Sequence, residues 1–475
     1  MPVKIAFIGA GSIGFTRTLI RDVLTVPQLQ DTHFALHDIN KRNLDMIGRL
    51  CRKDIKDNEL PAKITTSLQR KRALEDTDYV VNCTRIGGLE AFELDIEIPL
   101  KYGVDQCVGD TICAGGIMYG QRNVPQIRAF QKDIKAVAAD HCLLLNYANP
   151  MAINTWAALD ACDRGEGVNT IGLCHGVEGT WHKIARALGA KHYKDVDIIA
   201  AGINHQTWFT RIVYKGREIT GETLLKAMMK DPAIARNEKT RLDVLNRFGY
   251  FSTESNGHLS EYLPWYRKRP NEIRKWIGTS HWDCGETGGY LRFCREGRNW
   301  FEAEYDKWMK DAGRPISPQL RSHERGSYII EALETDRTLQ TFVNVRNNGC
   351  ITNLPDDCIV EVPACLDRSG IQVNPIGDLP LACAATCNAS INVQRMAKEA
   401  AVHGDVTLLK QAMLHDPLVA AVCNPPEVWQ MTDEMLVAQA EWLPNYKKSE
   451  INAATKRLDA GKIKTRKWKG TSRKK

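Results

Sequence analysis

The 475-residue chain has no apolar run long enough to cross a membrane, and its first residues have none of the features of a secretory leader. A membrane-spanning helix needs about 20 consecutive apolar residues. A leader needs a charged region, an apolar region and a small-residue cleavage site, whereas residues 1–8 enter a predicted strand directly. We therefore expect a cytoplasmic protein without a membrane partner.

Cys-x-x-Cys pairs are also absent, although the chain contains 15 cysteines. In a chain of this length without a leader, such spacing indicates reduced thiols rather than a disulfide scaffold. The hydrophobic fraction of 43% and the charged fraction of 25% are those of an ordinary globular protein. The length predicts two or more structural units.

An overall negative charge is missing too, since the formal net charge is +7. Residues 447–475 hold twelve Lys or Arg and two acids, a charge of +10, which leaves −3 for the remainder. A basic segment can bind nucleic acid, but only Trp468 interrupts this charge with an aromatic ring. We therefore predict a basic, flexible tail over residues 447–475 and no nucleic-acid partner.

The first 200 residues alternate predicted strands and helices. Apolar spacing predicts helices at Ser12–Leu24 and Asn40–Asn58. Continuous apolar runs predict buried strands at Val3–Ile8, Phe34–Leu36, Asp78–Asn82 and Cys142–Asn146. This alternation predicts an α/β fold, with a Rossmann-type, doubly wound parallel sheet over residues 1–200.

The pattern changes after about residue 200. Polar, tryptophan-rich stretches precede a predicted strand pair at Thr341–Val345 and Cys358–Val362, and helical periodicity returns over Ile391–Met413. We therefore predict a second, α+β domain over residues 201–446, which would bind substrate or form oligomer contacts.

The pattern Gly9-x-Gly11-x-x-Gly14 follows the first strand and opens the first helix, with Ser12 at the turn. Gly9 suits a tight turn, Gly11 lets the backbone approach a pyrophosphate, and Gly14 lets the helix pack on the sheet. The helix N-terminus then offers amide donors to the phosphates. Asp38, at the end of the second strand, is placed to bind a ribose diol and so favours NAD over NADP.

Cys174 and His205 each follow an apolar run that predicts a short strand. A thiolate and an imidazole can bind one divalent metal ion. Taken singly, however, each residue is better explained as a buried core residue than as a metal ligand. Pairing them requires further evidence.

That evidence is a set of motifs which together resemble glycoside hydrolase family 4 across residues 3–445, and in particular its bacterial α-galactosidase branch. The motifs, in chain order, are Phe7–Ser12, Gly109–Thr111, Gly115–Met118, Leu145–Met151, Asn154–Trp156, Gly172–His175, Ala201–His205, Gly249–Phe251, Glu261–Tyr262, Asn344–Asn347, Asn353–Pro355 and Ile391–Gln394.

The resemblance implies an NAD- and divalent-metal-dependent α-glycosidase, a class that does not rely on two carboxylates. It implies oxidation of the sugar at C3, deprotonation at C2, elimination of the aglycone, addition of water and re-reduction at C3. A metal ion would polarise the C3 carbonyl, and NAD would carry the hydride. The net reaction is hydrolysis.

The resemblance also implies roles for single residues. Cys174 and His205 match the metal ligands, with Mn²⁺ as the family's usual ion, although a thiolate is a soft ligand for it. Asn149 matches a residue that binds the sugar hydroxyls. Asp110 matches a position near the metal's water or the nicotinamide.

Acid and base candidates follow from the same resemblance. His175 stands where phosphosugar relatives carry a general acid; the alternative is that it only orients the metal site. For the base at C2 the order of preference is Tyr262, then His258, with Asn256 last because an amide is not a base. The alternative for Tyr262 is that it lines the sugar pocket.

The sequence departs from the family's usual pattern at Cys113–Gly116 and at Tyr119. These positions are expected near the cofactor and the sugar, so the identity of the substrate sugar stays undecided. An α-galactoside is favoured; an α-glucoside, an α-galacturonide and a sulfoquinovoside are the alternatives. Arg85, Arg346 and Arg122 are candidate contacts to an anionic sugar, or else ion-pair partners within the protein.

Two other functions are compatible with the N-terminal half. One is a dehydrogenase of the 2-hydroxy-acid type, and the other is a non-catalytic regulator that binds NAD or sugar. The family resemblance also implies a homodimer or homotetramer.

Overall fold

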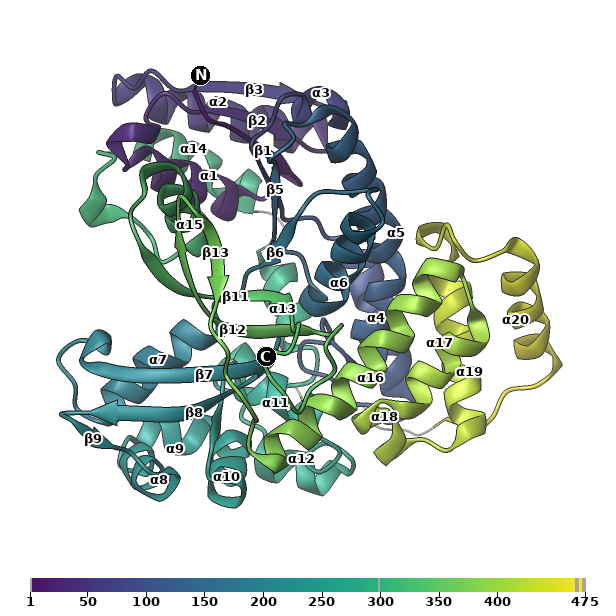
Figure 1. The fold of residues 1–475 in the computed structure, drawn as a ribbon. Coiled ribbons are helices and arrows are strands. Elements are labelled where there is room, and N and C mark those ends of the chain that lie inside the picture. The colour runs from purple at the N-terminus through teal and green to yellow at the C-terminus, as the bar shows by residue number, and fades with distance from the viewer. Residues whose placement is uncertain (1, 298–299, 466–469, 472–475) are drawn as a thin grey trace.

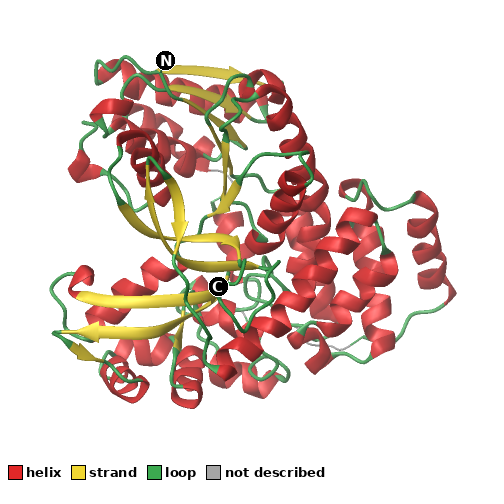
Figure 2. Ribbon diagram, in the orientation of Figure 1, coloured by secondary structure: helices red, strands yellow, loops and turns green. Residues whose placement is uncertain are grey.

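A computed structural model describes residues 2–297, 300–465 and 470–471. Within these ranges no helix combines the length and the apolar character needed to span a bilayer. Figures 1 and 2 show an upper α/β part, a lower part of strands and short helices, and a group of helices at one side.

The N-terminal part is a parallel sheet with the strand order of a dinucleotide-binding fold. Neighbouring strands follow the order β3-β2-β1-β4-β5-β6, which is the doubly wound Rossmann arrangement. The strands are β1 (Lys4–Ile8), β2 (His33–His37), β3 (Lys63–Ser67), β4 (Tyr79–Asn82), β5 (Leu143–Asn146) and β6 (Thr170–Gly172). The predicted fold class is confirmed.

Both faces of the sheet are buried at its central strands β1, β4 and β5, which is why these strands are nearly continuous apolar runs. Successive strand residues point to opposite faces. Ile5 and Phe7 belong to the core formed with α1 (Ile13–Leu24), α2 (Lys41–Asp57) and α15 (Arg325–Thr335). Ala6 and Ile8 belong to the core formed with α3 (Arg70–Leu74), α4 (Gly88–Lys101), α5 (Cys113–Val137) and α6 (Met151–Asp163).

The sheet continues into the second half of the chain without a break. Asn344 in β11 pairs with Gly172 in β6, and from there the strands are antiparallel. This half comprises β7 (Val196–Ile203), β8 (Gln206–Tyr214), β9 (Arg217–Glu218), β10 (Phe251–Ser252), β11 (Leu339–Arg346), β12 (Ile359–Asp367) and β13 (Gly370–Val373). The predicted boundary at residue 200 therefore falls inside a strand.

Short helices form the tryptophan-rich middle of the chain. They are α7 (Gly176–Ala187), α8 (Gly221–Met229), α9 (Pro232–Asn237), α10 (Lys239–Phe248), α11 (Asn256–Tyr262), α12 (Pro270–Trp276), α13 (Gly289–Glu296) and α14 (Trp300–Asp311). Single 3-10 turns are η1 (Pro27–Leu29), η2 (Tyr193–Asp195), η3 (Trp282–Cys284), η4 (Pro318–Leu320) and η5 (Ala440–Trp442).

The C-terminal helices pack against α5 and complete its core. They are α16 (Leu381–His403), α17 (Val406–His415), α18 (Pro417–Val422), α19 (Pro425–Ala438) and α20 (Lys448–Ala460). The helix predicted over Ile391–Met413 is divided at Gly404, whose φ is +66°. The segment expected to be a flexible tail begins with α20, which an ion pair of 2.8 Å between Arg457 and Asp433 fixes to α19.

Candidate active site

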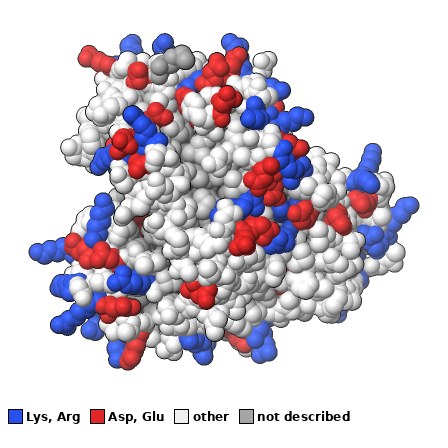
Figure 3. All heavy atoms as spheres, in the orientation of Figure 1, with Lys and Arg blue, Asp and Glu red and all other residues white. Residues whose placement is uncertain are grey.

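A cavity of about 590 Å³ lies where β5, β6 and β7 end. Ligands of doubly wound sheets bind at the carboxyl ends of the strands. Figure 3 shows a largely uncharged surface between the upper and lower parts on the left of this face, with a mixed cluster of acidic and basic side chains to its right. The cavity is lined by Val108, Asp110, Asn149, Cys174, His175, Gly176, Gly179, Thr180, Lys183, His205, Glu254, Ser255, His258, Trp282, Asp283, Tyr290 and Phe293.

The structure brings Cys174 and His205 together and adds a carboxylate. Cys174 follows β6, His205 lies in the β7–β8 turn, and Glu254 follows β10. One ligand atom from each lies within 4.8 Å of the others. The Cys174 thiol donates to Oε1 of Glu254 at 3.2 Å, and the same oxygen is 4.0 Å from Nε2 of His205. Sulfur, nitrogen and oxygen donors converge here as in a divalent-metal site.

Without a bound cation, the Cys174 thiol of this cluster is protonated, whereas a metal ion binds the thiolate. Burial, reinforced by Glu254, raises the pKa of the Cys174 thiol well above its ordinary value. Burial lowers the pKa of the His205 imidazole below its ordinary value. Burial alone would raise the pKa of Glu254, but His205 and His258 lower it. A bound cation would stabilise the thiolate that the metal-free cluster disfavours.

Thr111 fixes the orientation of the His205 ring. Its Oγ1 donates to Oδ1 of Asp110 at 2.9 Å and lies 2.6 Å from Nδ1 of His205. Because this hydroxyl's hydrogen goes to Asp110, Nδ1–H of His205 is the donor to Thr111. Nε2 then has a free lone pair on the side of Glu254 and Cys174, the arrangement typical of a histidine metal ligand.

Asp110, Asn149 and His258 form the adjoining wall. Nδ2 of Asn149 donates to Oδ2 of Asp110 at 2.7 Å. Nδ1 of His258 is 2.7 Å from the Ser255 hydroxyl, and its Nε2 is 3.9 Å from Oδ1 of Asp110. Burial would raise the pKa of Asp110, but His258 and His205 lower it, so it is a carboxylate.

A buried charge network holds the segment that carries Asp110. The carboxylate of Glu261 accepts the backbone N–H groups of Cys107, Val108 and Gly109 at 2.6, 3.1 and 2.9 Å. Charge-assisted bonds of this kind are strong where water is excluded. Glu261 lies on α11 with His258, so one helix positions both sides of the cavity.

His175 and Tyr262 occupy different environments. His175 is exposed at the start of α7 and lines the cavity, with Nε2 3.3 Å from Oε1 of Glu324. Tyr262 is buried in the core formed with α5 and is absent from the cavity lining. Burial, together with Asp110 and Glu261, raises its pKa well above the ordinary value.

The glycine turn after β1 is shaped by Asp38. Its Oδ2 accepts the N–H of Gly11 at 2.7 Å and its Oδ1 that of Asn40 at 2.8 Å. Gly9 has a φ of +85°, and a Cβ at Gly11 would lie 2.7 Å from the Asp38 carboxylate. A Cβ at Gly14 would meet nothing within 4 Å, so the close packing predicted there is not found. Ser12 caps α1 without a side-chain hydrogen bond, and the turn remains open to a ligand.

The three predicted arginines have different surroundings. The Arg85 guanidinium lies over the rings of Phe92, Tyr119 and Tyr290 at 4.7, 5.3 and 5.6 Å. Tyr290 lines the cavity, so Arg85 stands behind its wall.

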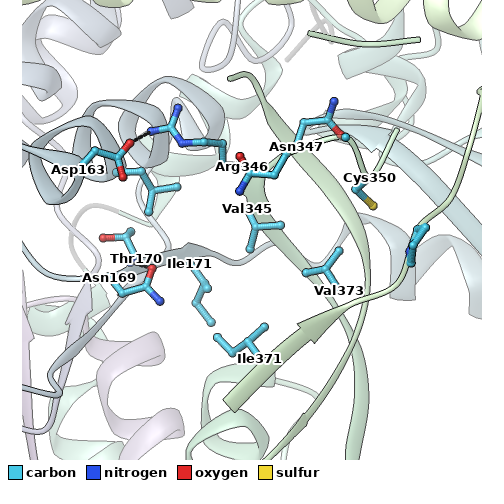
Figure 4. A pocket seen from close by; sticks show the side chains of 14 residues that line it. Asp163, Asn169, Thr170, Ile171, Val345, Arg346, Asn347, Cys350, Ile371 and Val373 are labelled. Atoms are coloured by element: carbon cyan, nitrogen blue, oxygen red, sulfur yellow. Dashed lines mark hydrogen bonds and ion pairs between the residues drawn. The ribbon is translucent and has the colours of Figure 1, made fainter. Parts of the chain in front are cut away.

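Arg346 and Arg122 do not reach this cavity. Arg346 lines a separate pocket of about 600 Å³, where it pairs with Asp163 at 2.8 Å (Figure 4). It also pairs with Asp160 at 3.0 Å. Arg122 pairs with Asp95 at 2.6 Å in the interior. For both arginines the structure favours the alternative role stated above, that of an ion-pair partner within the protein.

Three residues of the site have no distinctive sequence signal. Glu254, Thr111 and Glu324 are single polar residues in loops or at a helix start. Only Thr111 belongs to a motif quoted above, Gly109–Thr111, and its partner His205 is 94 positions away.

The fold and the site together define a dinucleotide-binding α/β enzyme with a metal-type donor cluster at the edge of its sheet. The chain belongs to glycoside hydrolase family 4. Residues 4–190 match the Family 4 glycosyl hydrolase domain, and residues 200–419 match the Family 4 glycosyl hydrolase C-terminal domain. The predicted resemblance is confirmed.

Relatives with names or structures fit this assignment. An alpha-galactosidase from Rhizobium meliloti (strain 1021) is 56% identical over 99% of this chain and 95% of its own length. The solved structure of lplD from Bacillus subtilis has a TM-score of 0.79 at 26% identity, covering 91% of this chain and 99% of its own. A 6-phospho-alpha-glucosidase from gut microorganisms, solved in complex with NAD and Mn²⁺, shares the fold with a TM-score of 0.75 at 18% identity, covering 94% and 100%.

Proposed function

We propose that the protein is an NAD- and divalent-metal-dependent α-galactosidase. The observation that carries this is the convergence of Cys174, His205 and Glu254 in one cavity of a family 4 chain. The 56% identity to an alpha-galactosidase over nearly the whole chain supports the choice of sugar.

The residues present fit both absent groups. The turn at Gly9 and Gly11 has no room for a Cβ, as a cradle for a pyrophosphate requires, and Asp38 would hold the ribose. Cys174, His205 and Glu254 offer one soft and two harder donors, which suit Mn²⁺ or another divalent ion. NAD would supply a hydride acceptor for the sugar, and the metal would supply a Lewis acid.

The side chains around the metal donors orient the sugar and move its protons. Asn149, held by Asp110 at 2.7 Å, binds the hydroxyls next to C3. His258 takes the C2 proton at Nε2, in the tautomer whose Nδ1–H donates to Ser255. Tyr262 ranked first by sequence, but its absence from the cavity lining now places it second.

His175 is the general acid of this proposal. It lines the cavity beside Cys174, and its Nε2 lies 3.3 Å from Oε1 of Glu324. From this position Nε2 gives a proton to the leaving glycosidic oxygen. Arg85, behind Tyr290, adds positive potential to the sugar side of the cavity.

A p-nitrophenyl α-galactoside incubated with NAD, Mn²⁺ and a thiol reductant tests the proposal. Release of p-nitrophenol that needs only catalytic NAD and stops with EDTA is the expected result. Stoichiometric NADH would instead indicate a dehydrogenase. Faster turnover of an α-glucoside, α-galacturonide or sulfoquinovoside would overturn the choice of sugar, and cofactor binding without any turnover would overturn the enzyme.

Two remaining proposals concern the cellular location and the oligomeric state of the enzyme. We propose a cytoplasmic location, in keeping with fifteen free cysteines, and a homodimer or homotetramer. Size-exclusion chromatography with light scattering measures the latter.

A further inference from the structure

The C-terminal segment returns to the catalytic part of the molecule. The N–H of Thr287 donates to the carbonyl of Thr471 at 2.9 Å, and the N–H of Thr471 donates to Oγ1 of Thr287 at 2.6 Å. Figure 1 shows α20 at the outer edge of the C-terminal helices, whereas α13, which begins two residues after Thr287, lies in the middle. Residues that the sequence assigns to a flexible tail thus pair with a loop of the body.

That loop runs from η3 to α13 and is bonded to the segment that leads to Asp110. The hydroxyl of Thr287 donates to Oδ2 of Asp105 at 2.8 Å, and the N–H of Gly288 donates to the carbonyl of Gln106 at 2.8 Å. Asp105 is fully buried and paired with Arg267. Thr287 therefore contacts the C-terminal segment on one side and the buried charge network on the other.

The two elements that this loop connects, η3 and α13, build one wall of the active-site cavity. Trp282 and Asp283 precede Thr287, and Tyr290 and Phe293 follow it; all four line the cavity. Aromatic rings that line a sugar site pack against the sugar's apolar face. A shift of the loop would therefore alter the space for substrate while leaving the glycine turn after β1 in place.

Two further contacts, one at Ile463 and one at Gly470, favour the contact between Thr471 and Thr287. Upstream, the N–H and the carbonyl of Ile463 bond to the side chain of Gln430 at 2.6 and 3.4 Å, which ties the segment to α19. Downstream, Gly470 has a φ of +77°, and a Cβ there would lie 2.5 Å from the Thr287 side chain. Only glycine combines that backbone conformation with that closeness.

We propose that Gly470–Thr471 is a positioning element of the active site, which docks on Thr287 and holds the loop between Trp282 and Tyr290 in place, so that these two rings stay against the cavity. This inference rests on the proposed function in taking that cavity as the sugar site. Gly470 and Thr471 then belong to the catalytic unit, and their undocking from Thr287 loosens the substrate wall.

The test compares two alanine substitutions in the full-length enzyme. Gly470→Ala places a methyl group against Thr287. Gly216→Ala is the matched control, since Gly216 also has a positive φ, +71°, but a Cβ there meets nothing within 4 Å. We expect Gly470→Ala to raise KM for the galactoside about three- to tenfold with kcat changed less than about twofold and NAD affinity unchanged. The control, Gly216→Ala, should have the wild-type KM, kcat and NAD affinity.

Hydrogen exchange at the amide of Thr287 provides a readout without turnover. It should be faster in Gly470→Ala than in the control, and faster again in a variant that ends at Thr465, which keeps the Ile463 contact. If the wild type hydrolyses no glycoside, the proposed function fails while this readout still decides the docking. Unchanged exchange in both variants, or an unchanged KM in an active enzyme, would overturn the inference.

Discussion

The Thr111 hydroxyl lies 2.6 Å from Nδ1 of His205 and thereby determines which ring nitrogen faces the metal donors. Removing an outer hydrogen bond to a metal-binding histidine typically lowers metal affinity about 10- to 100-fold. We expect Thr111→Val to raise the Mn²⁺ concentration for half-maximal activity by that factor, while NAD affinity stays unchanged. Thr386→Val, on the exposed side of α16, is the control. Equal Mn²⁺ dependence in both variants would contradict the orientation of His205.

Cys174→Ser tests the metal donors directly. A serine hydroxyl remains protonated where a thiol loses its proton to a cation, so turnover at ordinary Mn²⁺ concentrations should disappear and NAD should still bind. Activity assays and isothermal titration with NAD separate these effects. Glu254→Gln should also weaken Mn²⁺ binding, because an amide oxygen carries no charge. Wild-type turnover in Cys174→Ser would exclude it as a ligand.

The position of His258 predicts that proton transfer at sugar C2 depends on it more than on Tyr262. His258→Asn should slow turnover about 100-fold or more, and Tyr262→Phe should slow it much less, because that hydroxyl does not line the cavity. Product formed in D₂O by the wild type should carry deuterium at C2. The reverse order of the two variants would restore Tyr262 as the base, and unlabelled product would indicate direct displacement.

Two glycines of the β1–α1 turn should respond differently to a methyl group. Gly11→Ala pushes the Asp38 carboxylate from its place 2.7 Å from the Gly11 N–H, so NAD affinity should fall at least about tenfold, equivalent to about 1.4 kcal/mol. Gly14→Ala meets nothing within 4 Å and should change NAD affinity by less than about threefold. Fluorescence titration with NADH measures both, and equal losses would show that Asp38 does not shape this site.

Asp416 predicts a pH dependence of stability. Its buried carboxyl accepts the N–H of Cys113 at 2.8 Å, and burial raises its pKa to about 6, above the value of about 3.9 in an unfolded chain. Between these values the folded state holds a proton that the unfolded state has lost, so this group's contribution to stability falls as pH rises toward about 6. Each pH unit in that range corresponds to about 1.4 kcal/mol.

Asp416→Asn removes this titration and keeps an acceptor at the start of α18. We expect the variant to be at least as stable as wild type at pH 7.5, and the wild type to gain on it by about 1 kcal/mol at pH 5. Thermal unfolding at both values gives the comparison. A wild-type advantage that grows with pH would reverse the assigned sign.

The sequence predicted the Rossmann half well because its signals are local. Val3–Ile8 and the other buried strands of this sheet are uninterrupted apolar runs, and the glycine turn lies beside its own strand. The site was only partly predictable. Cys174 and His205 were found through family motifs, but Glu254 joins them through the folding of a loop, and loop closure leaves no periodic signal.

Arg346 and residues 447–475 are two further cases in which contacts between distant segments could not be predicted from the sequence. The sequence around Arg346 does not show that the fold places two carboxylates of α6, those of Asp160 and Asp163, beside its guanidinium. Net charge likewise predicts solvation for residues 447–475, whereas helix α20 and the pairing of Thr471 with Thr287 depend on contacts with distant segments. The composition of a segment predicts how exposed it is on average, but it does not predict which distant residues the segment contacts.

The pairing of Asn344 with Gly172 bears on how substrate enters. This pairing joins the half that carries the glycine turn to the half that carries His205 within one sheet, so a hinge movement between the two halves would have to break it. The sheet thereby sets the separation between the glycine turn and the metal donors. We therefore expect ligands to reach the cavity by movements of the loops around it rather than by a swing of one half away from the other.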